Sequence, residues 1–167
     1  MTGVLVFLGL VVLAAVVAAT VVVRSGKRNY AKANEVVPGT ATKAPAEWAG
    51  AHSPEARLHR RLRDAVEALR ANPAMEDAWR IDARVSLEQH ALTVDERLVA
   101  VAALPERVRV EPMASVAAAV EAVEAAVASL VAGPGPEARP GLDRAMAEVD
   151  QWVAKLPRAD GGLEPEG

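Results

Sequence analysis

The three histidines, His52, His59 and His90, are the first candidates for acid–base or metal chemistry in this sequence. A zinc site usually needs two closely spaced histidines or pairs of cysteines, and the chain has no cysteine and no such histidine pair. Glu55 lies four residues before His59, and in a charged helix we interpret the two as a solvated pair. We interpret His90 as a residue near the C-terminal end of a helix, where the dipole favours it.

Two acidic pairs, Glu121 with Glu124 and Glu148 with Asp150, are the other candidates for acid–base work. Di-iron bundles combine inward carboxylates with Glu-x-x-His motifs, and this sequence contains no Glu-x-x-His. It also lacks the Gly-x-Ser-x-Gly elbow, the phosphate-binding loop and the dinucleotide fingerprint. We therefore predict no catalytic residue, no metal ligand and no cofactor, and an enzyme of unrecognised type is the least favoured alternative.

A basic cluster occupies one predicted helix. Its members are Arg57, His59, Arg60, Arg61, Arg63 and, further along, Arg70. One interpretation is contact with anionic lipid headgroups, to which each basic residue near the surface adds about 1 kcal/mol. The alternative is a solvated face on which the arginines pair with Asp64 and Glu67. Nucleic acid is not an expected partner, because no aromatic stacking residue accompanies the arginines and the chain is acidic overall.

The longest uncharged segment runs from Val4 to Val23 and consists mostly of Val, Leu and Ala. A helix of that length reaches about 30 Å, the thickness of the hydrocarbon core of a bilayer. Four basic residues follow this segment and none precedes it. They are Arg24, Lys27, Arg28 and Lys32. The positive-inside rule then predicts a single-pass protein of the inner (plasma) membrane, with its N-terminus outside and its C-terminal domain in the cytoplasm.

The alternative for the same segment is a cleaved signal peptide. A signal peptide has a basic start and a shorter apolar core than this one, which favours the anchor. The charge distribution agrees with two different surroundings: residues 1–72 hold ten Lys and Arg against five Asp and Glu, and residues 73–167 hold nine against seventeen. The bias toward Ala, Val and Arg, with only 3% aromatic residues, is typical of a GC-rich bacterial genome.

Two further segments look irregular. Residues 24–52 are predicted to be a basic juxtamembrane segment and a flexible linker, because Pro and Gly interrupt them without a sustained period. Within them Trp48 either packs onto the first helix of the domain or contacts the membrane or a partner. Residues 158–167 are acidic and rich in Gly and Pro, and we expect a disordered tail.

Residues 53–157 carry helical periodicity throughout. Ser53 followed by Pro54 predicts the start of a first helix, which ends at Asn72 before Pro73. A second helix is predicted to open at Pro73. The capping-box pattern of Thr93 and Glu96 then predicts a third, short helix that ends at the residue before Pro105.

Residues 105–111 are predicted to be irregular. A fourth helix over residues 113–131 has apolar residues at alternating spacings of three and four, and a fifth covers 142–156. Five amphipathic segments with short connections and no convincing strand predict an all-α fold: a single N-terminal transmembrane helix followed by a small antiparallel bundle of about five helices.

The absence of a chemical motif and the presence of an anchor favour a membrane-anchored cytoplasmic interaction module that binds a protein partner at the inner membrane surface. The alternative is a small-ligand-binding or sensing bundle with a pocket between the fourth and fifth helices. Self-association through the 113–131 helix is a further expectation, because its apolar spacing resembles a short coiled-coil seam.

Overall fold

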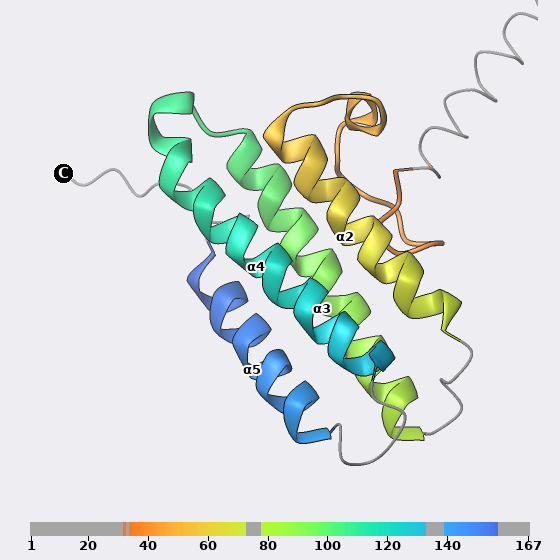
Figure 1. Ribbon diagram of the computed structural model, residues 1–167. Helices are drawn as coiled ribbons and strands as arrows, with labels where there is room; N and C mark the ends of the chain where they lie inside the picture. Colours follow the sequence, from red (N-terminus) through yellow and green to blue (C-terminus); the bar gives the residue numbers. More distant parts are fainter. Residues whose placement is uncertain (1–31, 33, 73–77, 133–138, 157–167) are drawn as a thin grey trace, which may run out of the picture.

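The computed structural model describes residues 32, 34–72, 78–132 and 139–156, and in these ranges the chain is helical with no strand (Figure 1). The elements are η1 (Ala46–Ala49, a 3-10 helix), α2 (Pro54–Ala71), α3 (Ala78–Ala102), α4 (Glu106–Ala132) and α5 (Arg139–Lys155). The predicted anchor, the basic residues Arg24, Lys27 and Arg28, and the predicted tail 158–167 lie outside the described residues. Lys32 is described and exposed.

Helix α2 begins and ends where its sequence predicts. The Ser53 hydroxyl accepts a hydrogen bond from the Ala56 amide at 3.3 Å, and Pro54 occupies the first helical position. Asn72, extended before a proline, closes the helix. The apolar face of α2 is buried, and it includes Leu58, Leu62, Val66 and Leu69.

Helix α3 corrects the prediction of separate second and third helices. The Thr93 hydroxyl donates to the Gln89 carbonyl one turn earlier, at 3.0 Å, and so does not cap a new helix. The second residue of the predicted capping box, Glu96, instead forms an ion pair with Lys43 at 3.1 Å. The buried stripe also continues without a break through this point, as Leu87, Ala91, Val94, Leu98 and Val101. The described residues therefore contain four α-helices rather than five.

Helix α4 begins at Glu106, so the prediction of an irregular segment over residues 105–111 was wrong. The helix runs through Pro112, which lies within its first two turns. Val108 and Val110 in this part are exposed, which explains why the sequence there shows no apolar stripe. From Val116 onward the predicted seam is buried against the other helices of the same chain, so that face is not open to a second copy.

In the described part of the chain, α4 is the one helix long and apolar enough to span a membrane, with 27 residues and a mean hydropathy of 1.7 over an 18-residue stretch. It lies in the middle of the sequence rather than at the N-terminus. The helix packs against α2, α3 and α5, and these three neighbours account for its apolar composition.

Helices α2, α3 and α4 form a three-helix core, and α5 packs on α4 and α3 (Figure 1). Contacts at both ends fix the directions. Arg70 near the end of α2 binds Glu88 in the first half of α3, so these two helices are antiparallel. Helices α2 and α4 are parallel neighbours, because Arg61 binds Glu124 and Asn72 lies beside Val131.

Candidate functional site

Residues 34–51, which we call the strap, pack on the three-helix core instead of forming a free linker. Val36 and Val37 are 1% and 4% exposed, and Trp48 in η1 is 8% exposed. In Figure 1 the strap is the orange segment that runs beside α2 and turns back to the start of that helix. The strap thus buries its apolar residues in the same core as the helices.

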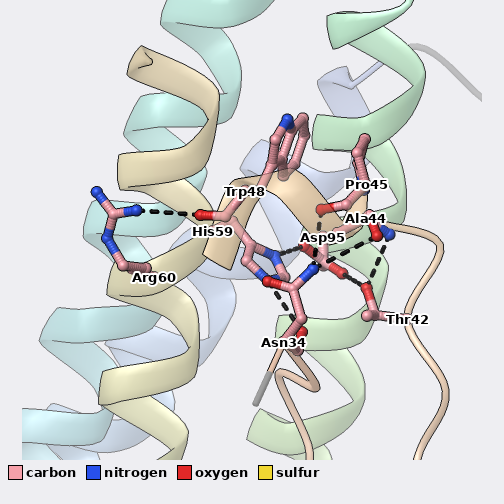
Figure 2. A network of polar contacts seen from close by, with 8 residues as sticks. All are labelled: Asn34, Thr42, Ala44, Pro45, Trp48, His59, Arg60 and Asp95. Atoms are coloured by element: carbon pink, nitrogen blue, oxygen red, sulfur yellow. Dashed lines mark hydrogen bonds and ion pairs between the residues drawn. The ribbon is translucent and has the colours of Figure 1, made fainter. Parts of the chain in front are cut away.

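His59 of α2 lies at the centre of a buried polar cluster beneath the strap (Figure 2). Its side chain has no exposed surface. The ring Nδ1 is 2.6 Å from the Asp95 carboxylate of α3, and Nε2 is 2.9 Å from the Asn34 carbonyl of the strap. One imidazole therefore connects two helices and the strap. The prediction that His59 is a solvated partner of Glu55 was wrong.

Asp95 receives a second contact from the strap. The Thr42 hydroxyl donates to its other carboxylate oxygen at 2.8 Å, and the same hydroxyl accepts from the Ala44 amide at 3.0 Å. Asp95 is 3% exposed. Both carboxylate oxygens are thus hydrogen-bonded, as burial of such a group requires.

The Asn34 side chain ties the start of the strap to residues ten and eleven positions later in it. Its amide nitrogen donates to the carbonyls of Ala44 and Pro45 at 3.4 and 3.1 Å. Because both partners are acceptors, they fix which end of the amide is nitrogen. The Asn34 side-chain oxygen is buried and has no hydrogen-bond partner among the described residues.

Trp48 and Arg60 close the outer side of the cluster. The Trp48 ring meets the His59 ring edge to face, with centroids 5.7 Å apart. The Arg60 guanidinium donates to the Trp48 carbonyl at 3.1 Å (Figure 2) and to the Ala51 carbonyl at 2.6 Å, and so fastens η1 to α2. Of the two interpretations of Trp48, the structure supports packing on the first helix of the domain.

The hydrogen-bond pattern limits the chemistry of the pair. The Asn34 carbonyl can only accept, so Nε2 of His59 carries a hydrogen, and one further proton lies between Nδ1 and Asp95. Both ring nitrogens are therefore occupied, and no face of the ring reaches solvent. In this conformation the cluster joins the strap to α2 and α3 and presents no open group to a substrate.

The predicted basic cluster does not form one open surface. Arg61 makes two hydrogen bonds to Glu124 of α4, at 2.8 and 2.6 Å, and Arg63 pairs with Asp64. Arg60 is used by the strap, whereas Arg57 is exposed.

Two arginines of α2 have shifted pKa values. The hydrogen bonds that Arg61 donates to Glu124 raise the pKa of Arg61, and those that Arg70 donates to Glu88 raise the pKa of Arg70. Both guanidinium groups are therefore fixed as cations that join α2 to its neighbours.

His90 lies in the middle of α3, so its predicted place near a helix end was wrong. Its ring contacts the Ser86 carbonyl at 2.7 Å and the Asp150 carboxylate of α5 at 2.6 Å. It links α3 to α5 as His59 links α2 to α3, but at a partly exposed position. In the described ranges no group of three or more His, Asp or Glu residues is placed to hold a metal ion.

A signal for the His59 cluster was present in the sequence. His59 lies three residues before Leu62 and seven before Val66, on the apolar face of α2. Asp95 likewise follows Val94 and precedes Leu98 on the buried stripe of α3. A polar residue on each of two facing apolar stripes predicts a buried pair, provided the two helices are known to be neighbours.

In comparisons with protein families, with characterised proteins and with solved structures, the chain matches none.

Proposed function

We propose that this protein is a single-pass membrane protein in which residues 4–23 anchor a helical interaction module at the cytoplasmic face of the inner membrane. The uncharged run and the four basic residues that follow it support the anchor and its direction. The module binds a protein partner at the membrane surface rather than a small molecule.

The observation that carries the proposal is the fixation of the strap. The strap lies between the proposed anchor and α2, and the His59 cluster holds it against α2 and α3. A bundle on a free tether would take all orientations relative to the membrane. A bundle whose connecting segment is part of its own core presents a more restricted set of surfaces, which suits a docking module.

The absence of cysteine makes the anchor and its direction directly testable. We expect a Thr2→Cys variant in intact cells to react with a membrane-impermeant maleimide. A Gln151→Cys variant, on an exposed position of α5, is expected to react only after permeabilisation. Labelling of Gln151→Cys from outside would overturn the direction, and release of the protein by alkaline carbonate would overturn the anchor.

The interaction role is tested by crosslinking in the same membranes. A discrete crosslinked species larger than one chain supports it, whether the added mass is another protein or a second copy. Recovery of the monomer alone, under conditions that crosslink a known membrane complex, contradicts it.

A further inference from the structure

Two acceptors face the two nitrogens of the His59 ring (Figure 2). Nδ1 lies 2.6 Å from a carboxylate oxygen of Asp95, and Nε2 lies 2.9 Å from the Asn34 carbonyl. A carbonyl or an ionised carboxylate can only accept. Both contacts are therefore satisfied only if each ring nitrogen carries a hydrogen, or if Nε2 carries one and the Asp95 carboxyl group carries the other. In either case the pair holds one proton more than a neutral imidazole beside an ionised carboxylate.

Loss of that proton breaks a contact that the ring cannot restore by changing its tautomer. A neutral ring with its hydrogen on Nε2 keeps the Asn34 contact but turns the Nδ1 lone pair toward Asp95. With the hydrogen on Nδ1, the ring keeps Asp95 and turns the Nε2 lone pair toward the Asn34 carbonyl. The side chains of the pair are 0% and 4% exposed, so a net negative charge left between them is also costly.

The other charged groups of α2 around the ring are engaged elsewhere. Glu55, one turn before the ring, pairs with Arg109 of α4 at 3.4 Å. Arg60 donates to the carbonyls at the end of η1, and Arg63, one turn after the ring, pairs with Asp64 at 2.8 Å. None of these side chains supplies the ring with a second ionic partner.

The strap and α3 contribute one charged group to the ring. Glu96 of α3 pairs with Lys43 of the strap at 3.1 Å, and the Glu35 carboxylate accepts from the Gly39 amide at 2.8 Å. Among the described residues, Asp95 is thus the charged group that touches the ring. The proton balance of the closed strap is set by this pair.

We propose that the His59–Asp95 pair is a proton-dependent latch, which holds the strap closed while it carries the shared proton and releases it as the pH rises. In the open strap the Asn34 carbonyl is gone, so a neutral ring with its hydrogen on Nδ1 satisfies Asp95 and accepts from water at Nε2. Opening therefore no longer requires the extra proton. By linkage, a higher pH favours the open strap by up to about tenfold per pH unit for one proton.

The strap lies between the proposed anchor and α2, so its release would free the orientation of the bundle at the membrane. This consequence rests on the proposed function. The latch itself depends only on contacts among Asn34, Thr42, His59 and Asp95. It can therefore be measured in the full chain in detergent, whatever the topology of the anchor.

A buried thiol in the strap reports its opening. Val36→Cys replaces a side chain that is 1% exposed, and its rate with iodoacetamide is divided by that of Ala46→Cys, an exposed position of the strap, at the same pH. The ratio cancels the ionisation of the thiol. We expect it to rise at least about tenfold between about pH 6 and about pH 9, where histidine ordinarily changes its charge.

Leu142→Cys on α5, 3% exposed, is the control for general loosening of the bundle, and its ratio is expected to stay constant. A flat Val36→Cys ratio over this range would overturn the latch. An equal rise at Leu142→Cys would overturn it as well, because the pH would then act on the whole bundle.

Asp95→Asn in the Val36→Cys background separates a shared proton from a merely structural contact. The new amide oxygen can accept from Thr42 while its nitrogen donates to Nδ1 of a neutral His59 ring, whose Nε2 still donates to Asn34. The strap is then closed without the extra proton, and protonation of the ring sets two donors against each other. We expect the pH dependence to reverse, with the strap opening as the pH falls.

Two results with Asp95→Asn would contradict the latch. One is the same rise with pH as in the parent chain. The other is a strap that is open at every pH while Leu142→Cys stays protected, since the carboxylate would then act as a fixed charge.

His90→Gln is the matched histidine control, because His90 also binds a carboxylate at 2.6 Å but away from the strap. It is expected to keep the parent profile, and loss of the rise in this variant would contradict the assignment to His59. Correct labelling of Thr2→Cys and Gln151→Cys with a flat Val36→Cys ratio rejects the latch alone. A pH-dependent strap in a chain that alkaline carbonate releases from membranes supports the latch and rejects the proposed anchor.

Discussion

Replacing His59 by alanine is expected to release the strap from the helices while the rest of the bundle stays folded. The change removes the donor to the Asn34 carbonyl and the partner of the Asp95 carboxylate in one step. Asp95 would then keep only the Thr42 hydroxyl as a side-chain partner from the cluster.

The size of the effect follows from burial. The His59 and Asp95 side chains are 0% and 4% exposed. Breaking a buried pair by removing one partner costs about 3–5 kcal/mol, because the remaining charge is left uncompensated. Since each 1.4 kcal/mol corresponds to a factor of ten, the population with an open strap should rise at least about a hundredfold.

The assay uses the cysteine-free background. Val36→Cys places a thiol at a position that is 1% exposed, so a maleimide reacts with it only when the strap opens. The labelling rate is compared with and without His59→Ala. Ala46→Cys, at an exposed position of the strap, gives the rate of the freely accessible thiol.

Two further variants make the result decisive. Leu142→Cys on α5 is 3% exposed and reports opening of the bundle at α5, away from the strap, and its rate should change much less than that of Val36→Cys. His90→Ala is the matched histidine control and should leave the strap closed. An unchanged Val36→Cys rate in His59→Ala would refute the reasoning, and so would equal acceleration at Val36 and Leu142.

Three other changes test the energetic assignments, each by denaturant unfolding of the full chain in detergent. His90→Ala should lower the unfolding free energy by at most about 1 kcal/mol, because its partner Asp150 is 68% exposed; a loss comparable with that of His59→Ala would contradict this assignment. Ser53→Ala should cost about 1 kcal/mol through loss of the α2 cap, whereas Ser115→Ala, in the interior of α4, should cost less. Arg61→Ala should also lower the unfolding free energy by at most about 1 kcal/mol, since the Arg61 side chain is 40% exposed. The loss should be smaller at high salt, because salt screens the ion pair with Glu124. Because Glu124 raises the pKa of Arg61, the contribution of this ion pair to the unfolding free energy is present below arginine's ordinary pKa and is lost only above it. The effect of Arg61→Ala should therefore be constant from about pH 6 to about pH 9. A steady fall of the effect in that range would contradict the assignment.

Much of the helical framework could be predicted because its signals are local. Ser53 and Pro54 mark the start of α2 through backbone chemistry that acts within one turn. The apolar spacing after Met113 predicts the buried face of α4, and the structure confirms it for Val116, Val120 and Val123. These features need no knowledge of the neighbouring helices.

The errors arose where tertiary packing overrides a local pattern. The capping-box residues Thr93 and Glu96 occur inside α3, because the buried stripe continues past them and rewards a continuous helix. Pro112 and the exposed Val108 and Val110 hid the first turns of α4. Neither effect can be read without the partners of each helix.

The His59 cluster could not be assembled from the sequence for a similar reason. His59 and Asp95 are separated by 36 residues, and their contact exists only because α2 and α3 are antiparallel neighbours. Val36 and Val37 are too short a run to predict a buried segment, and the prolines and glycines around them predicted a linker. The strap is ordered by the surface beneath it rather than by its own periodicity.

Hydrogen exchange of the full chain in membranes tests most directly the claim that the strap is part of the bundle. The amides of Thr40, Ala44 and Trp48 are hydrogen-bonded within the strap, at 2.9, 3.0 and 3.0 Å. We predict that they exchange at least about a hundredfold more slowly than an unstructured peptide, and that His59→Ala removes this protection while α5 keeps its own. Exchange of these amides at the rate of a free linker in the unmodified protein would contradict the account.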